Sequence, residues 1–299
     1  MGPEPSGKNI REFGIETPSW LDLEFNEPQS MESHLDLISR LRNFATLCLG
    51  ERVYISNLIF RGPEEEVAPG EKHAPLIECF YAQNPRPEVR EKKLLLSGVT
   101  TEDFGESAAC VFDNWLQLYD KITPSLNVMF AALYVDMYIE ERFLLACQSV
   151  EVLHRHLWPD SYVGEDEYNE IQAKLVESIP ADVSEGLRAK LEGLLTYGNE
   201  FSLRRRLKDI SDRWTSIGAE KIVHLDTAFI NDVVNTRNYY THYDISLREK
   251  AKDGAALFQL YSKLVLTAMA VVFSELGASM ELVAEKLGRH RQFGQYVGT

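Results

Sequence analysis

Helical periodicity through the second half of the chain restricts its fold more than any other feature. From about Leu126 onward, apolar residues recur at spacings of three and four, which is the pattern of helices that each bury one face. The first of these helices is predicted to run from there to Trp158, and Asp226 is a good N-cap for a later one. The remaining helical segments are predicted over residues 165–178, 184–197, 202–217 and 252–276. Helices joined by short connections pack as an up-and-down bundle, so a mainly α protein is expected.

The pattern before Leu126 is mixed. After Ser30 a helix is predicted to end at Gly50, and the period then changes to two, which indicates strands. The strand signals are the alternations Val53, Ile55, Ile59 and Ile77, Cys79, Tyr81, with a third short strand over residues 94–96. The acidic segment between Arg61 and Gly70 is interpreted as the loop that connects the first two strands.

A helix over about residues 107–121 is expected to close this first unit. The chain is therefore predicted to consist of a flexible tail at 1–30, a small α+β domain at 31–125, and a helical bundle with a C-terminal tail at 126–299.

Composition excludes several classes of protein. The 299 residues carry 31 basic and 46 acidic side chains, so the formal net charge of −15 argues against a surface that coats nucleic acid. The longest apolar run, residues 264–273, is too short to span a bilayer, and the chain does not open with a signal-peptide pattern, so a cytoplasmic protein without membrane contact is expected. The four cysteines are interpreted as reduced core residues, and neither a metal nor a cofactor is expected. No phosphate-binding glycine loop or nucleophile elbow is present in the sequence.

One pair has the spacing of a metal ligand set. Glu151 and His154 form an E-x-x-H, but di-iron bundles need a second copy of it on another helix, and the sequence has none. We therefore interpret Glu151 as satisfying a polar contact inside the bundle, near the helix that follows Asp226, and His154 as lying at a helix end.

The segment RNYYTHYD, residues 237–244, places polar groups where a core would have leucine. Arg237, Asn238 and His242 follow the apolar positions of the same helix. A guanidinium can bind two phosphate oxygens and an imidazole exchanges protons near neutral pH, so together they suit metal-free cleavage of a phosphodiester. The structural alternative is that both side chains complement the helix dipole at its C-terminal end.

Three segments resemble the Apea-like HEPN domains: YIEERFLLACQSVEVLHRHLW, FSLRRRLKDI and FINDVVNTRNYYTHYD, at 138–158, 201–210 and 229–244. The segment VFDNWLQLYDKI, at 111–122, is similar to part of the N-terminal domain of ApeA-type anti-phage proteins. The resemblance implies a five- or six-helix bundle and a metal-independent ribonuclease that acts on host or phage RNA in abortive infection and limits phage growth. One candidate substrate is tRNA, and the phage-derived trigger is unknown. Arg237 and His242 then correspond to the ends of the family's R-x4-6-H motif, and Asn238 to the polar position after its arginine.

In some HEPN proteins the motif continues as H-x-Y, and a nucleotidyltransferase partner modifies that tyrosine. Here Tyr243 follows His242 directly and Asp244 occupies the modified position, so a two-component system of that type is not expected.

The roles expected from this resemblance are specific. His242 is the proposed general base or acid, Arg237 the clamp on the phosphate, and Asn238 a ligand of the imidazole or the phosphate, with Glu151 and Tyr243 in support. Because one histidine cannot easily act as base and acid in one step, a homodimer with a composite site is expected. The sizeable basic cluster is interpreted either as an RNA contact or as a solvated helix face; its members are Arg204, Arg205, Arg206 and Lys208, with Arg213 beyond them. For Arg206, one turn before Ile210, packing against the bundle is a further alternative. The alternative function is a catalytically silent HEPN module that dimerises or binds RNA, preceded by a sensor domain.

Overall fold

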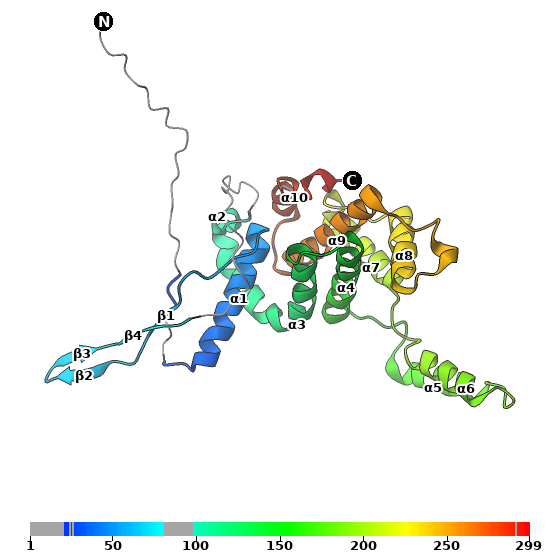
Figure 1. Ribbon diagram of the computed structural model, residues 1–299, viewed down its shortest axis with the longest axis horizontal. Coiled ribbons are helices and arrows are strands. Elements are labelled where there is room, and N and C mark those ends of the chain that lie inside the picture. The colour runs from blue at the N-terminus through cyan, green and yellow to red at the C-terminus, as the bar shows by residue number, and fades with distance from the viewer. Residues whose placement is uncertain (1–20, 24, 26, 81–97, 291) are drawn as a thin grey trace, which may run out of the picture.

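A computed structural model describes residues 21–23, 25, 27–80, 98–290 and 292–299 (Figure 1). Its longer helices are α1 (Met31–Leu49), α3 (Ala108–Tyr134), α4 (Ile139–Leu157), α5 (Glu165–Glu177), α6 (Glu185–Thr196), α7 (Leu203–Ile217), α8 (Thr227–His242), α9 (Gly254–Glu275) and α10 (Met280–Gly288). The short helix is α2 (Thr101–Phe104), and the strands are β1 (Ile59–Arg61), β2 (Glu65–Ala68), β3 (Glu71–His73) and β4 (Leu76–Glu78). The strand predicted over 94–96 and most of the expected N-terminal tail lie outside the described residues.

The centre of the molecule is a helical bundle in which α4 contacts α3, α7, α8 and α9 (Figure 1). The apolar stripe of α4 supplies the core, because Phe143, Cys147, Val150 and Leu153 are all buried. The predicted fold class, a mainly α protein built around a helical bundle, is confirmed. Helix α9 has the length and apolar composition of a membrane span, but 83% of its most apolar window is buried inside the protein, as in the core helix of a soluble protein.

The first bundle helix differs from its prediction. A single helix was expected to reach Trp158 from about Leu126, and another to end near Lys121; instead α3 runs through both regions to Tyr134 and α4 begins at Ile139. Proline usually ends or kinks a helix, yet Pro124 lies inside α3. The reason is packing, since Ile122, Leu126 and Met129 continue one buried stripe across it. The expected domain boundary after residue 125 therefore falls within a continuous helix.

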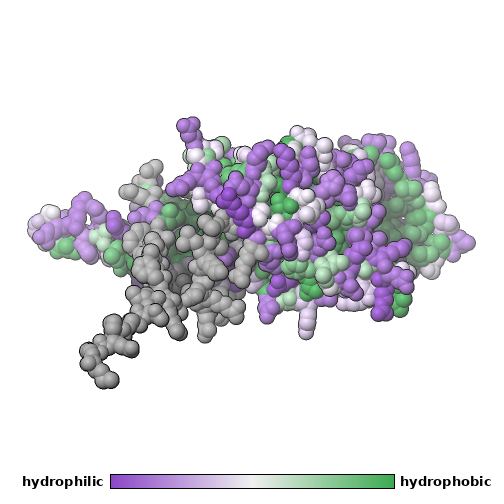
Figure 2. All heavy atoms as spheres, turned by 90° about the horizontal axis from the view of Figure 1, so that it is seen from above, coloured by the Kyte–Doolittle hydropathy of each residue, from purple (hydrophilic) through white to green (hydrophobic). Residues whose placement is uncertain are grey.

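The strands form a narrow antiparallel ribbon that projects from the body (Figure 1). Strand β1 pairs with β4 and β2 pairs with β3. Two predictions were wrong here: the acidic segment expected to be a loop contains β2, and the first strand begins at Ile59 rather than at Val53. The ribbon is visible at the left of Figure 2, where apolar and polar residues are mixed along it. Its exposed apolar side chains are Ile59, Val67, Leu76 and Ile77.

Helices α1 and α3 join the N-terminal segment to the bundle. The Trp115 indole donates to the carbonyl of Arg40 over 3.2 Å, and the Asn43 amide donates to the Tyr119 hydroxyl over 2.8 Å. Lys286 of α10 pairs with Asp103 of α2 at 2.7 Å, and this hydrogen bond holds the pKa of the Asp103 carboxyl at about 2. The apolar core therefore extends from α1 and α3 into the bundle without interruption.

The cysteines are free, as expected, but they are not all core residues. Cys48 and Cys147 are buried, whereas Cys79 is half-buried and Cys110 is exposed. Cys110 lies in the first turn of α3, where it is exposed although the next residue, Val111, is buried.

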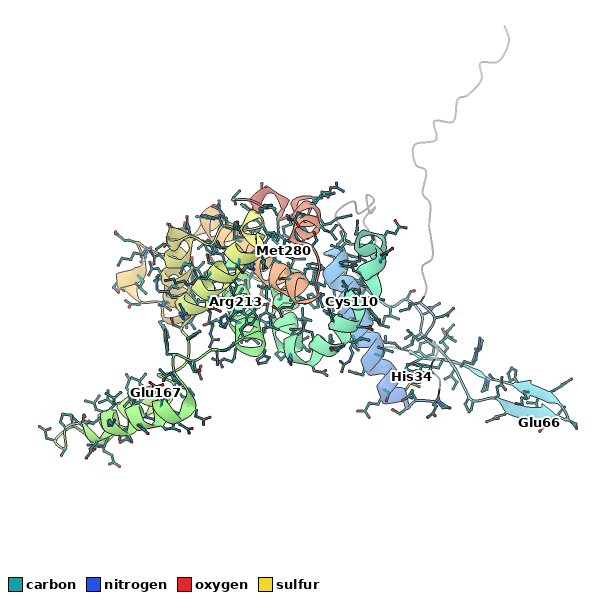
Figure 3. All side chains as sticks on the ribbon, turned by 180° about the vertical axis from the view of Figure 1, so that it is seen from behind. His34, Glu66, Cys110, Glu167, Arg213 and Met280 are labelled. Atoms are coloured by element: carbon teal, nitrogen blue, oxygen red, sulfur yellow. The ribbon has the colours of Figure 1, made fainter. Side chains whose placement is uncertain are left out.

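Helices α5 and α6 have the predicted bounds but lie outside the bundle. They form a hairpin that projects from it (Figures 1 and 3), and neither helix contains a buried residue. The prediction of one bundle was wrong for these two helices, because periodicity shows that a helix has an apolar face but not what covers that face. We call residues 159–200 the arm.

Candidate functional site

Helix α8 positions the polar motif. It begins as predicted at Asp226, whose carboxylate accepts a 2.7 Å hydrogen bond from the backbone N–H of Phe229. Phe229, Ile230, Val233 and Thr236 anchor its inner face in the core. The motif therefore lies on a helix whose rotation about its own axis is fixed by packing.

Arg237 lies at the edge of the bundle between α8 and α4. Its guanidinium donates to the Asn238 side-chain oxygen over 3.2 Å and approaches the Glu151 carboxylate at 4.0 Å. The side chain is 34% exposed and that of Glu151 is 27% exposed, so solvent reaches this pair. The interpretation of Glu151 as a polar contact near the motif helix matches this geometry.

Burial and the neighbouring cations act in opposite directions on the pKa of the Glu151 carboxyl. Burial raises the pKa of the Glu151 carboxyl above its ordinary value, while Arg237 and Arg206 oppose that rise. The guanidinium therefore stabilises the charged form of a carboxylate that burial disfavours, and the carboxylate in turn holds the guanidinium at the mouth of the site.

His242 is the last residue of α8 and is exposed. It lies five residues after Arg237, which on a helix is about 140° around the axis, whereas Asn238 lies one turn before it. Tyr243 follows with a φ of 51°, in the left-handed region, and its N–H donates to the Tyr239 carbonyl, which ends the helix. The structure thus brings Arg237, Asn238 and Glu151 together. His242 lies one turn beyond Asn238 and on a different side of α8 from Arg237.

An aromatic cluster that the sequence pattern did not reveal surrounds the end of α8. The rings of Tyr239, Tyr240 and Tyr243 make edge contacts, with centroids 5.1 to 6.5 Å apart. The Tyr240 hydroxyl donates to the Lys252 carbonyl over 3.2 Å, which ties the cluster to the segment before α9. The sequence signal that could have indicated this cluster is the adjacent pair Tyr239 and Tyr240 inside the motif. Tyr243 itself is 67% exposed beside His242.

The basic cluster divides into two parts. Arg204 and Lys208 are exposed, Arg204 donates to Asn231 of α8, and Arg205 lies over the Phe201 ring at 5.0 Å. Arg206 is only 1% exposed, so its prediction as an RNA contact was wrong. The physical reason is its register, because it lies one turn before the buried Ile210 on the inner face of α7.

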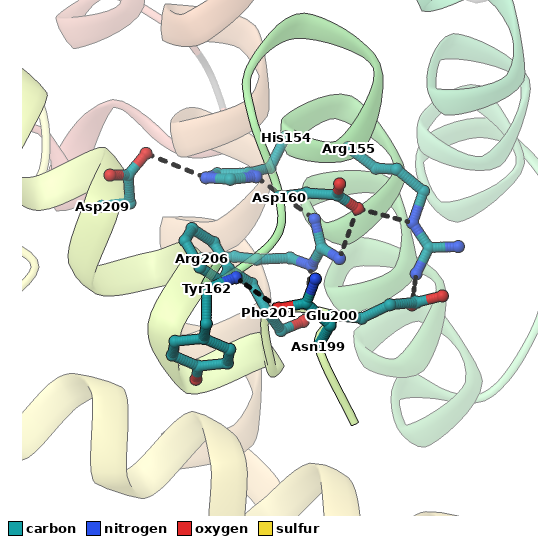
Figure 4. Close-up of polar contacts among 9 residues, drawn as sticks. All are labelled: His154, Arg155, Asp160, Tyr162, Asn199, Glu200, Phe201, Arg206 and Asp209. Carbon is teal, nitrogen blue, oxygen red and sulfur yellow. Dashed lines mark hydrogen bonds and ion pairs between the residues drawn. The ribbon is translucent and has the colours of Figure 1, made fainter. Parts of the chain in front are cut away.

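Arg206 belongs to a buried polar network that joins α4, α7 and the base of the arm (Figure 4). His154 is fully buried; its Nε2 lies 3.0 Å from Asp209 and its Nδ1 lies 3.2 Å from the Arg206 guanidinium. The guanidinium also pairs with Asp160 at 3.2 Å and donates to the Phe201 carbonyl over 3.0 Å. Because Arg206 can only donate, Nδ1 accepts and Nε2–H donates to Asp209, which fixes the neutral tautomer.

The two residues of the E-x-x-H therefore have different partners. Glu151 contacts Arg237, whereas His154 contacts Asp209 and Arg206. The sequence pattern placed His154 at a helix end and gave no indication of this network, because its members come from three separate segments.

An arginine and a histidine near the end of one helix of the bundle are the features on which the sequence resemblance to HEPN domains rested. Residues 144–282 match the Apea-like HEPN family, and residues 2–115 match ApeA N-terminal domain 1. The chain thus contains one segment similar to the Apea-like HEPN family and one similar to ApeA N-terminal domain 1, as the sequence resemblance predicted. This combination suggests a role in anti-phage defence and a nuclease-like activity. No curated protein and no solved structure is significantly similar to the chain.

The buried network predicts how stability depends on pH. Burial and Arg206 lower the pKa of His154 below its ordinary value of 6.5, so between 6.5 and the lowered value the unfolded chain binds more protons than the folded one. This contribution to stability is complete above pH 6.5 and is lost as the pH falls through the folded-state pKa. We expect the free energy of unfolding, measured by urea denaturation between pH 7.5 and 5, to decrease toward acid, and the decrease to be smaller in His154→Gln.

The matched control is His156→Gln, two residues away on the exposed side of α4. Burial also lowers the pKa of His290, which contributes in the same direction in all three proteins, so the comparison isolates His154. An equally steep decrease in wild type and His154→Gln would contradict the assignment.

Proposed function

We propose that the chain is a metal-independent endoribonuclease of anti-phage defence, with Arg237, Asn238 and His242 as its catalytic residues. The observation that carries the proposal is the contact of Arg237 with Asn238 and Glu151 at an exposed edge of the bundle, one turn before His242. The segment lies inside the region that matches the Apea-like HEPN family. A guanidinium held this way keeps further N–H donors for phosphate oxygens, since an arginine has five of them.

The chemistry follows from what ribose supplies. The 2′-oxygen attacks the adjacent phosphorus, the bond from phosphorus to the 5′-oxygen breaks, and the products are a 2′,3′-cyclic phosphate and a 5′-hydroxyl. His242 either accepts the proton of the 2′-hydroxyl or donates one to the leaving 5′-oxygen. Arg237 stabilises the negative charge on the non-bridging oxygens, and Asn238 holds the phosphate or the imidazole.

Two further residues support these roles. The Glu151 carboxylate faces the Arg237 guanidinium and restrains its rotation. The exposed Tyr243 ring, next to His242, offers a face on which an unpaired base of single-stranded RNA can stack.

The angular separation of Arg237 and His242 favours a composite site. The two side chains lie on different sides of α8, and one imidazole cannot act as base and acid in the same step. A second copy across a two-fold axis places its His242 opposite the Arg237 of the first. It also brings two sets of cations together in a chain whose net charge is −15, which lessens the repulsion of RNA.

The first prediction from the proposed function concerns RNA cleavage. Total tRNA incubated with the protein in EDTA is expected to yield fragments with 2′,3′-cyclic phosphate ends, and Arg237→Ala or His242→Ala is expected to lower the rate at least ~100-fold, because each removes charge stabilisation or proton transfer. Fragment ends are read by direct sequencing.

The matched controls are Arg289→Ala at the end of α10 and His73→Ala on β3, which replace exposed residues of the same types away from the motif. Equal cleavage by His242→Ala and wild type would refute the assignment. No cleavage of any RNA, with or without phage infection, would instead identify a catalytically silent HEPN module.

The second prediction concerns oligomeric state. Sedimentation is expected to give twice the 34.1 kDa of one chain. Mixing inactive Arg237→Ala and His242→Ala proteins is expected to restore part of the activity, since a mixed dimer pairs an intact arginine of one copy with an intact histidine of the other. A strictly monomeric protein that still cuts RNA would exclude the composite site.

The third prediction separates the solvent-accessible cations of α7, which are the exposed Arg204 and Lys208 and the half-buried Arg205, from the buried Arg206. In the triple variant Arg204→Ala/Arg205→Ala/Lys208→Ala, RNA binding is expected to weaken, and the slope of log affinity against log salt to become shallower by about 0.7 for each phosphate that is no longer neutralised. The control Arg188→Ala/Lys190→Ala changes cations of the arm instead. An unchanged slope in the triple variant would show that this face only contacts solvent.

A further inference from the structure

The arm exposes more apolar surface than its role as a connection requires. Ile171 and Leu175 of α5 are 38% and 46% exposed, and Leu187 and Leu194 of α6 are 46% and 62% exposed. We call these four residues the arm face. Single exposed apolar residues are ordinary on protein surfaces, whereas four large apolar residues on one small hairpin indicate a binding surface.

The four residues lie on the same side of the hairpin. The two helices pack on each other through half-buried residues, among them Tyr168 and Val176 of α5 and Leu191 and Leu195 of α6, and the Tyr168 hydroxyl donates to the Leu195 carbonyl. At 100° per residue, the exposed pair of each helix lies about 80° around the helix axis from the residues that pack on the other helix. The rotation has the same sense in both helices. Because the helices are antiparallel, equal rotations of the same sense point to the same side.

The charge of the arm identifies what fits there. Residues 159–200 contain ten Asp or Glu and three Lys or Arg, which gives a net charge of 3 − 10 = −7. RNA is repelled by such a surface, and a second copy of the arm carries the same negative charge. A cationic partner is attracted, and apolar side chains between its charges would cover the arm face.

An ion pair and several hydrogen bonds at the base of the arm fix its position relative to the bundle. Arg155 pairs with Glu200 at 2.6 Å, and the Phe201 N–H donates to the Asp160 carbonyl over 2.7 Å (Figure 4). The Asn199 side chain accepts from the backbone N–H of Tyr162 and Val163 at 3.1 and 3.0 Å and donates to the Val163 carbonyl. A protrusion fixed in this way loses little conformational entropy when it binds a partner.

We propose that the arm is a docking site for a basic amphipathic helix of a partner protein. Apolar residues of that helix contact the arm face, and its Lys and Arg side chains pair with the acidic residues around it. Helix α5 has 13 residues and α6 has 12, so a partner helix of roughly four turns matches their length of about 18–20 Å. This docking is independent of RNA cleavage, because none of the four residues belongs to the motif on α8.

The test uses the full chain and a labelled 18-residue peptide of leucine and lysine that forms an amphipathic helix. Fluorescence anisotropy is expected to show binding that weakens with salt and that falls at least ~10-fold in Leu187→Gln/Leu194→Gln, since the variant replaces half of the apolar arm face with polar side chains. Both leucines are exposed, so the variant is expected to keep the circular dichroism spectrum of the wild type. The control Ile59→Gln/Leu76→Gln changes two equally exposed apolar residues of the β ribbon and is expected to bind like the wild type.

Two outcomes overturn the proposal. One is equal peptide affinity in wild type and Leu187→Gln/Leu194→Gln, or equal affinity for a peptide of the same composition whose leucines are distributed around the helix. The other is self-association, seen by light scattering without peptide, that disappears in the leucine variant alone, because the arm face would then be occupied by a second copy.

Discussion

The buried contact between Arg206 and His154 is the interaction on which the described architecture depends. A guanidinium that is 1% exposed is costly to bury unless its N–H groups find acceptors, and here the acceptors are the His154 ring, the Asp160 carboxylate and the Phe201 carbonyl. These groups come from α4, from the start of the arm and from the segment just before α7. One side chain therefore fixes how the arm leaves the bundle and how α7 packs on α4. Removing it would leave the buried His154 Nδ1 without its donor and the Asp160 carboxylate with Arg155, at 3.5 Å, as its remaining cation.

The same end of α4 supports the candidate site. Glu151 lies one turn before His154, and it receives positive potential from both Arg206 and Arg237. The two arginines therefore differ in how deeply they are buried. Arg206 is itself buried and its guanidinium has three protein acceptors, whereas Arg237 is one third exposed and contacts a carboxylate at 4.0 Å, a distance that leaves its guanidinium able to bind an anion. In a strongly acidic chain, such a local cation at an exposed edge is the feature that makes a phosphate-binding site physically reasonable.

The sequence predicted the parts of this structure that depend on local pattern. The bounds of α5, α6, α7 and α9 and the N-cap at Asp226 follow from periodicity and capping chemistry, which act within one helix. It missed what depends on packing between segments: α3 continues through Pro124 because a buried stripe holds it, and the arm leaves the bundle although its helices have ordinary apolar faces. For the candidate site, the pattern selected Arg237, Asn238 and His242 and predicted the proximity of Glu151 to the motif helix. It grouped Arg206 with the RNA-contact candidates and left packing against the bundle as the alternative. Charge alone cannot show whether an arginine in an amphipathic helix faces solvent or a buried histidine.

The proposed cleavage requires His242 and Arg237 to act on one bound phosphate. The most direct measurement is an NMR titration of the His242 imidazole with 2′-O-methyl RNA, which binds like a substrate but lacks the nucleophile. The ring resonances of His242 are expected to shift as the RNA saturates the protein, and the shift is expected to be absent in Arg237→Ala. Ring resonances that stay unchanged at saturating RNA would contradict a shared phosphate site.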